Sequence, residues 1–186
     1  MNEALKGPFS KDKILIFDID DTLAITAAKI KVCDQKTGAC FELTPEEFNT
    51  YEKHRNHILN FDDFKSLDVM KAAKMIDKYL NILAKNYKAG NAIGIITARD
   101  DENMIYTWLK EHVGFHISRD LIWAVNDPKR GLTGDIAQKK QAAMRFFIEQ
   151  GFTDISFFDD DKKNIKLIDE LGKEMGIKIK THLARH

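Results

Sequence analysis

The chain has 186 residues, of which 44% are hydrophobic and 31% are charged, and its formal net charge is zero. This length suits one domain with a small insertion, and the composition provides both a sizeable core and a charged surface. The balanced charge excludes a general basic field for nucleic acid or anionic membranes and leaves room for a local basic patch. No apolar run approaches the roughly 20 residues of a spanning helix, so no membrane partner is expected.

The cysteine content predicts a reducing environment. The chain has two cysteines, Cys33 and Cys40, too few for a disulfide framework, so we expect free thiols in a cytoplasmic protein. Their spacing to His54 and His57 fits no zinc-finger pattern. Residues 1–13 contain no apolar leader segment, which agrees with a cytoplasmic location. No obligate protein partner is evident.

The first element expected in the chain is a buried strand that ends in acidic residues. Apolar residues run without a break from Ile14 to Phe17, a pattern typical of a strand buried on both faces of a parallel sheet. Asp18, Asp20 and Asp21 follow. Carboxylates at this position repel one another and resist leaving water, which favours a compensating cation. Ligands of open α/β sheets bind beyond the carboxyl ends of the strands, so chemistry is expected here.

An insertion follows this strand. Residues 24–66 interrupt the alternation of strands and helices. We therefore interpret them as a small flap over the carboxyl edge of the sheet. Alternating polar and apolar residues on both sides of a turn-like segment predict a β-hairpin over 29–43. Thr44 and Glu47 form a capping-box pattern, which predicts a helix that continues toward Ile58.

The rest of the chain alternates between sequence patterns typical of helices and of strands. A long helix is expected from Ser66 or Asp68 to Tyr87. Further strands are predicted at 92–97, 121–125, 155–158 and 177–183, with helices at 100–113, 135–150 and 163–175. This alternation predicts a Rossmann-like α/β fold, a single domain over residues 1–186 with a parallel sheet and helices on both faces. The last strand alternates, which places it at an edge of the sheet.

Polar groups at strand ends form the candidate site. Three strands end in such groups: Asp18 and Asp20 after the first, Thr97 and Arg99 after the second, and Asp159 and Asp160 after the fourth. Parallel strands bring these ends to one rim, where two acidic clusters would bind a hard cation, Mg²⁺ above all. A free carboxylate beside that cation can attack a phosphoryl group, and a second carboxylate can serve as general acid and base.

Four motifs in order resemble those of the haloacid dehalogenase-like (HAD) phosphohydrolases. They are Phe17-Asp18-Ile19-Asp20-Asp21-Thr22-Leu23, Ile95-Ile96-Thr97-Ala98-Arg99, the helix start around Lys139 and Lys140, and Phe157-Phe158-Asp159-Asp160-Asp161-Lys162-Lys163-Asn164. The motifs span almost the whole chain and fall on the expected strands. One acidic pair alone would be a weak signal, whereas four ordered motifs are specific.

The resemblance implies a Mg²⁺-dependent phosphomonoesterase that forms an aspartyl-phosphate. Asp18 would be the nucleophile and a metal ligand. Asp20 would be the general acid and base, with its backbone carbonyl on the metal, and Thr97 would hydrogen-bond the phosphoryl group. Asp160, with Asp159 beside it, would hold Mg²⁺. An acid at position 20 resembles the phosphatases of the family, which also includes phosphotransferases.

The motif lysine is ambiguous in the sequence. Lys139 and Lys140 are adjacent, about 100° apart on a helix. Lys140 falls on the apolar side of that helix, which faces the sheet together with Ile136, Ala143, Met144 and Phe147. We therefore expect Lys140 to serve as the catalytic lysine and keep Lys139 as the alternative.

The substrate is expected to contact the flap and the rim. Residues 30–64 and the Thr97-Ala98-Arg99 turn resemble phage-encoded HAD proteins and, more distantly, the 3′-phosphatase domain of polynucleotide kinase–phosphatases, which implies a nucleotide or a nucleic-acid 3′-phosphate end. Arg99, Lys129 and Arg130 would contact its phosphates. No P-loop pattern is present, so no 5′-kinase activity is expected. The alternatives are a phosphatase of a small non-nucleotide metabolite and a non-catalytic HAD scaffold used for binding.

Overall fold

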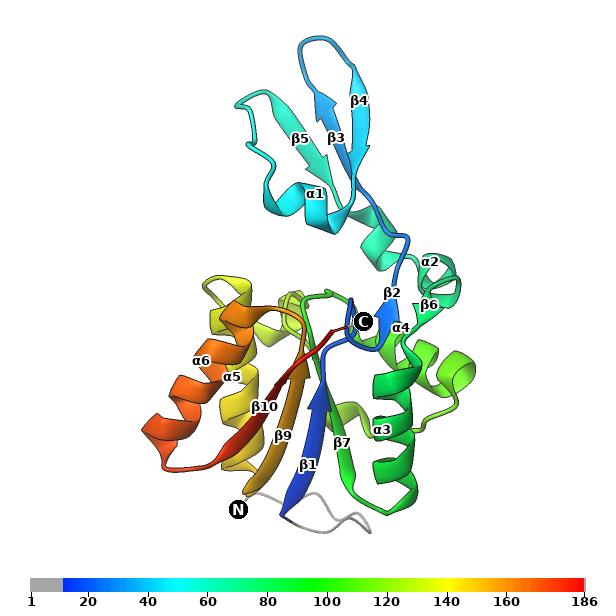
Figure 1. Ribbon diagram of the computed structural model, residues 1–186. Helices are drawn as coiled ribbons and strands as arrows, with labels where there is room; N and C mark the ends of the chain where they lie inside the picture. The colour runs from blue at the N-terminus through cyan, green and yellow to red at the C-terminus, as the bar shows by residue number, and fades with distance from the viewer. Residues whose placement is uncertain (1–11, 186) are drawn as a thin grey trace. The chain divides into compact units, whose positions relative to one another are not determined.

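The structure is a computed structural model that describes residues 12–185 (Figure 1). The segment up to residue 11, on which the absence of a leader was judged, lies outside this part. Among the described residues, one compact unit comprises 12–25 and 75–185, and a second comprises Thr26–Lys74. The sequence predicted the insertion at 24–66. None of the helices in the described part is long and apolar enough to cross a bilayer.

The first unit is built on a five-stranded sheet in the order β10-β9-β1-β7-β8, in which every strand pair is parallel. Its strands are β1 (Lys13–Phe17), β7 (Ala92–Thr97), β8 (Ile122–Ala124), β9 (Asp154–Asp159) and β10 (Ile179–Leu183). The α/β fold and the edge position of the last strand are thereby confirmed. Strand β1 lies at the centre, so the acidic residues that follow it emerge in the middle of the carboxyl edge.

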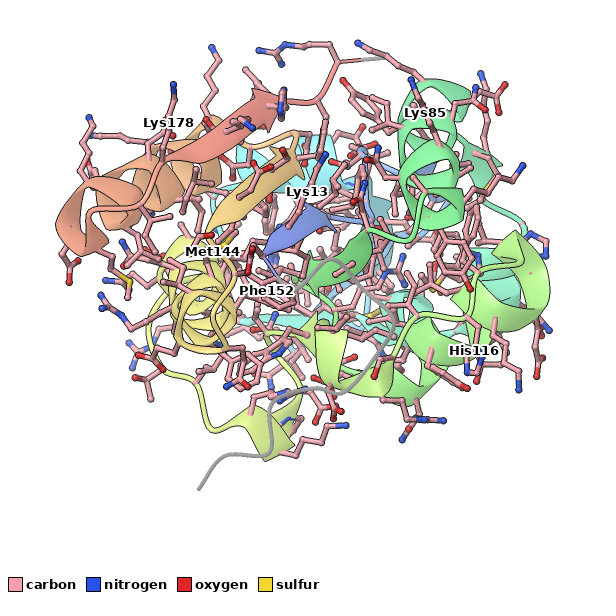
Figure 2. All side chains as sticks on the ribbon, turned by 90° about the horizontal axis from the view of Figure 1, so that it is seen from below. Lys13, Lys85, His116, Met144, Phe152 and Lys178 are labelled. Carbon is pink, nitrogen blue, oxygen red and sulfur yellow. A yellow bond between two sulfur atoms is a disulfide. The ribbon has the colours of Figure 1, made fainter. Side chains whose placement is uncertain are left out.

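Helices cover both faces of this sheet (Figure 1). On one side lie α3 (Asp77–Lys88) and α4 (Glu102–Thr107), the latter continued by a π-helical segment at Trp108–Val113, and on the other lie α5 (Ile136–Glu149) and α6 (Lys162–Met175). Figure 2 shows Met144 of α5 and Lys85 of α3 on opposite sides of the strand that begins at Lys13. Short 3₁₀ turns occur at Arg119–Leu121 and Pro128–Arg130.

The central strands pack closely because β7 contains a glycine. A Cβ atom at Gly94 would lie 3.2 Å from side-chain carbons of both Ile14 and Ile16. Both isoleucines are fully buried. Strand β7 can pack against their side chains at this point only because residue 94 has no side chain of its own. This packing fixes β1 against β7 and sets the positions of the residues at their carboxyl ends.

The second unit contains a three-stranded antiparallel sheet in the order β4-β3-β5. Its elements are β3 (Ile30–Asp34), β4 (Cys40–Leu43), α1 (Pro45–Asn49), β5 (His57–Asn60), a 3₁₀ turn (Asp62–Lys65) and α2 (Leu67–Lys71). The predicted hairpin and the capping box of Thr44 and Glu47 are confirmed. Two short strands, β2 (Ala24–Ile25) and β6 (Lys74–Met75), pair with each other where the chain leaves the first unit and returns to it.

Two helix predictions are wrong in this region. The helix expected to reach Ile58 ends at Asn49, because β5 pairs with β3 and sets Leu59 opposite the buried Val32. The long helix expected from residue 66 to residue 87 is divided into α2 and α3 by β6. Just after β6, the amide of Ile76 donates to the carbonyl of Leu23 at 2.9 Å. In both places, pairing with a distant strand overrides the local helix propensity.

The prediction of free thiols is also wrong, because Cys33 and Cys40 form a disulfide. The two residues face each other across β3 and β4, with their Cα atoms 4.2 Å apart. Antiparallel neighbours at this separation bring their side chains together, so the hairpin itself places the two sulfur atoms within bonding distance. The disulfide leaves no thiols for a zinc site, and the cytoplasmic location stays a prediction.

Candidate active site

Acidic side chains from two distant parts of the chain meet at the carboxyl edge of the sheet. Asp18 follows β1, and Asp159 and Asp160 lie at the end of the neighbouring strand β9. The amide of Asp18 donates to the carbonyl of Phe158 at 2.9 Å, which extends the strand pairing up to the site. One carboxylate oxygen from each of the three aspartates lies within 4.8 Å of the others.

A buried lysine from α5 completes this cluster. Nζ of Lys140 lies 2.9 Å from Oδ2 of Asp18 and 2.7 Å from Oδ2 of Asp159, and the residue is only 1% exposed. Nζ of Lys139 instead donates to Oδ1 of Asn126 at 2.8 Å. Of the two adjacent lysines, Lys140 is therefore the one that contacts the acidic cluster.

The hydrogen bonds divide the aspartates into two kinds. Both oxygens of Asp159 accept bonds, from Lys140, from Nδ2 of Asn164 at 2.9 and 3.2 Å, and from the amide of Asp161 at 2.9 Å. Oδ1 of Asp18 is buried and accepts no hydrogen bond within the described part of the chain. Asp159 thus anchors the lysine, whereas Asp18 keeps one carboxylate oxygen open for a ligand.

Burial shifts the protonation equilibria of the cluster. Loss of hydration raises the pKa of Asp18 well above its usual range, an effect that Lys140 opposes and the neighbouring carboxylates reinforce. Burial and the nearby Asp159 raise the pKa of Asp160 to about 6. Burial also disfavours the charged form of Lys140, but the charges of Asp18 and Asp159 outweigh it and raise the pKa of the lysine. The cluster carries more negative charge than one lysine balances.

These features fit a hard divalent cation. Asp18, Asp159 and Asp160 are the one group of three or more potential ligand side chains found in the region described, and all their donors are carboxylate oxygens. The unsatisfied Oδ1 of Asp18 provides a lone pair that no other group uses. Oxygen-only donors and excess negative charge favour Mg²⁺ over softer transition metals.

Thr97, Arg99 and Asp20 form the second part of the site. Thr97 ends β7, is fully buried, and accepts a hydrogen bond at Oγ1 from the amide of Arg99 at 3.4 Å. Nε and Nη2 of Arg99 donate to the two carboxylate oxygens of Asp20 at 3.0 and 2.7 Å. The sequence assigned Arg99 to the substrate, whereas in the structure this arginine is 3% exposed and holds Asp20.

The other two basic residues assigned to the substrate are paired with a buried acid. Nζ of Lys129 lies 2.9 Å from Oε2 of Glu102, and Nε of Arg130 lies 2.5 Å from Oε1 of the same side chain. The guanidinium of Arg130 also stacks on the ring of Trp123 at 3.9 Å. The loop after β8 is therefore tied to α4 by these contacts.

Sequence reasoning missed two residues that hold the site together. Asn164 lies in the fourth motif and donates to Asp159, and its signal was a polar side chain in the first turn of the helix that follows an acidic strand end. Glu102 is 7% exposed and balances two cations. Nothing in the sequence distinguished Glu102 from an ordinary helix-terminal acid.

Comparisons with known proteins give only distant similarity. No protein-family model and no curated protein matches the chain. Among solved structures, a HAD family enzyme, BT-2542 from Bacteroides thetaiotaomicron, matches as its magnesium complex with 14% identity and a TM-score of 0.47, covering 95% of this chain and 96% of that chain. The same enzyme with magnesium and inorganic phosphate matches with 14% identity, covering 94% and 96% of the two chains, at a TM-score of 0.49 for the wild type and 0.48 for an aspartate-to-alanine mutant. At this similarity we infer function from the side chains of this chain.

Proposed function

We propose that this protein is a Mg²⁺-dependent phosphomonoesterase of the HAD type that forms an aspartyl-phosphate on Asp18. The observation that carries the proposal is the environment of Asp18, where one carboxylate oxygen pairs with the buried Lys140 and the other has no hydrogen-bond partner in the described region. A carboxylate held beside a fixed positive charge, with further carboxylates nearby for a cation, is suited to attack a phosphoryl group.

The metal would be held by Asp18 and Asp160, with Asp159 placing Lys140 beside them. When bound, Mg²⁺ offsets negative charge on the phosphoryl oxygens and on the cluster. Lys140 favours the ionised form of Asp18 and adds a second fixed charge next to the reacting phosphorus. The hydroxyl of Thr97 has its proton free to donate to a phosphoryl oxygen, because Oγ1 accepts from the amide of Arg99.

The reaction would proceed in two displacements. In the first, an oxygen of Asp18 forms a bond to phosphorus, the ester P–O bond breaks, and Asp20 gives its proton to the leaving alcohol. In the second, water attacks the aspartyl-phosphate while Asp20 takes a proton from it, which releases inorganic phosphate and restores both carboxyl groups. Arg99 holds the Asp20 carboxylate at two points and so fixes its direction throughout.

The proposal for the substrate names a class of compounds rather than one compound. A nucleotide or a nucleic-acid 3′-phosphate end remains the predicted substrate class, supported by the resemblance of residues 30–64 and of the Thr97-Ala98-Arg99 turn in the sequence. The second unit, Thr26–Lys74, is proposed as a small flap that influences which esters are accepted. A small non-nucleotide metabolite is the alternative, and a higher kcat/KM for sugar phosphates than for nucleotides would favour it.

Phosphate release from a panel of phosphomonoesters, with and without MgCl₂, tests the proposal. We expect turnover that requires Mg²⁺ and that Asp18→Asn lowers by at least about 10³-fold. Asp120→Asn, the same change at an exposed position, is the matched control and should retain full activity. A phosphorylated Asp18 found by mass spectrometry after acid quenching would support the covalent step. Absence of Mg²⁺-dependent release from every ester would instead favour a non-catalytic scaffold.

A further inference from the structure

Lys139 lies next to the candidate active site and bonds to a neutral partner. Its Nζ donates to Oδ1 of Asn126 at 2.8 Å, and both side chains are partly buried. Across residues 12–185, no carboxylate forms an ion pair with this lysine. An ammonium group bonded to an amide keeps its full positive charge, and charge-assisted hydrogen bonds to an anion are about twice as strong as neutral ones.

The position of this ammonium group is fixed by the same turn that carries the second motif. The amide of Asn126 donates to the carbonyl of Arg99 at 3.2 Å, and Nδ2 of Asn126 donates to the carbonyl of Ala98 at 2.6 Å. On the other side, Lys139 directly precedes Lys140 in the first part of α5. Both anchors belong to the carboxyl edge of the sheet, so the charge of Lys139 is held at the edge that carries the catalytic cluster.

The three basic residues that the sequence assigned to the substrate are already compensated by acids of the protein. Arg99 forms its bidentate contact with Asp20. Lys129 and Arg130 share Glu102. A substrate anion would have to displace one of these carboxylates, and the buried acid left behind would lose its counter-ion. At Lys139 an anion displaces only the oxygen of an amide, which water can solvate.

We propose that Lys139, positioned by Asn126, binds a second phosphate group of the substrate. The preferred substrates are then phosphomonoesters that carry another phosphate near the one removed. Two sources share this chemistry, a small bisphosphate and a nucleic-acid end whose second phosphate is a phosphodiester. The inference rests on the proposed phosphatase function and assigns the recognition of the substrate to a residue different from Arg99, Lys129 and Arg130.

Relative activities of a Lys139→Gln variant test this assignment. For the wild type and the variant, kcat/KM is measured with p-nitrophenyl phosphate, adenosine 3′,5′-bisphosphate and a 3′-phosphorylated pentadeoxynucleotide. We expect the ratio of kcat/KM for a doubly phosphorylated substrate to that for p-nitrophenyl phosphate to fall about tenfold, mainly through KM. Lys139→Arg should restore most of the ratio. Lys166→Gln, which removes an exposed charge on α6, should leave the ratio at the wild-type value.

The outcomes separate the possible roles. A fall for the bisphosphate alone identifies a small-molecule substrate, and a fall for the oligonucleotide alone identifies a nucleic-acid end. An equal fall in kcat/KM for all three substrates would mean that Lys139 only supports the structure, and an unchanged kcat/KM for all three would mean that it touches no phosphate. If the wild type hydrolyses neither these three substrates nor any ester of the panel, the phosphatase proposal has failed, and calorimetric binding then tests the assignment of Lys139. Lys139→Gln must then weaken adenosine 3′,5′-bisphosphate binding about tenfold more than inorganic phosphate binding, and equal weakening overturns the assignment.

Discussion

Nζ of Lys140 lies 2.9 Å from Oδ2 of Asp18, and both residues are almost completely buried. The second contact of the lysine, with Asp159 at 2.7 Å, makes it the shared counter-ion of two carboxylates that belong to neighbouring strands. Removal of one member of a buried ion pair is more costly than the pair is worth, because the remaining charge is left without compensation in a poorly hydrated site.

Replacement of Lys140 by Met should therefore affect both activity and stability. We expect kcat/KM for p-nitrophenyl phosphate to fall at least about 10³-fold and the free energy of unfolding at pH 7 to fall by about 3 kcal/mol. The stability loss should become smaller as the pH falls, because burial raises the pKa of Asp18 and protonation removes its uncompensated charge. Lys166→Met, at a side chain that is 76% exposed, is the matched control and should change stability by less than about 0.5 kcal/mol. More than a tenth of the wild-type activity in Lys140→Met would contradict the assignment.

Mg²⁺ binding should weaken as the pH falls through the pKa of Asp160. Burial raises this pKa to about 6, so below pH 6 a cation must displace a proton before it binds. With one competing proton, the apparent affinity should fall about tenfold between pH 7.5 and pH 5, about fivefold of it between pH 6 and pH 5, and change little above pH 7. Calorimetric titration with MgCl₂ at pH 7.5, 6 and 5 measures this dependence. Equal affinities at pH 5 and pH 7.5 would show that Asp160 does not bind the metal.

The same raised pKa gives a prediction for the metal-free protein. Between about pH 4 and pH 6, the folded chain keeps a proton on Asp160 that the unfolded chain releases, so this group's contribution to stability decreases as the pH rises through that range. Asp160→Asn should consequently raise the melting temperature of the metal-free protein at pH 7 and abolish its response to MgCl₂. Thermal denaturation followed by circular dichroism checks both effects. A lower melting temperature for Asp160→Asn without metal would contradict the prediction.

The parts of the fold that were predictable from sequence are those with a local signal. Strands β1 and β7 contain continuous apolar runs, β9 contains a mostly apolar run interrupted by Ser156, and β10 alternates, so their order along the chain and their parallel arrangement followed directly. Helical spacing alone placed Lys140 on the buried side of α5. Parallel strands share one carboxyl edge, and this rule was sufficient to bring Asp18 and Asp160 together.

The features that were not predictable depend on partners far away in the sequence. Strand β5 exists because it can pair with β3, and its own residues gave no clear period. The contact of Arg99 with Asp20 depends on the direction of two side chains that leave different strands, which spacing does not determine. The disulfide was missed because a count of cysteines gives no register, whereas the hairpin register puts Cys33 opposite Cys40.

Arg99 and Asp20 should act as one unit in the reaction. We expect Asp20→Asn to lower kcat by about 10²- to 10⁴-fold, and Arg99→Gln to lower kcat by about tenfold or more through loss of the bidentate contact. In the double variant, the arginine change should add little, because it acts through the acid. Steady-state kinetics of the wild type, the two single variants and the double variant give the coupling between the two changes in a double-mutant cycle. If Arg99 contacts the substrate instead, Arg99→Gln raises KM, and the two effects multiply.

The disulfide should stabilise the second unit without affecting the sheet of the first. Closure of the short loop between Cys33 and Cys40 is worth about 2–3 kcal/mol through the reduced entropy of the unfolded chain. In a Cys33→Ser, Cys40→Ser double variant, hydrogen exchange measured by mass spectrometry should accelerate by up to about 150-fold in peptides from β3, β4 and β5, since each 1.4 kcal/mol is about tenfold. Peptides from β1 and β9 should exchange at wild-type rates, because Thr26–Lys74 forms a separate compact unit. Reduction of the wild type with dithiothreitol should reproduce the effect. Equal acceleration in β9 would contradict the independence of the two units, and no acceleration in β3 would show that the strand pairing alone holds the hairpin.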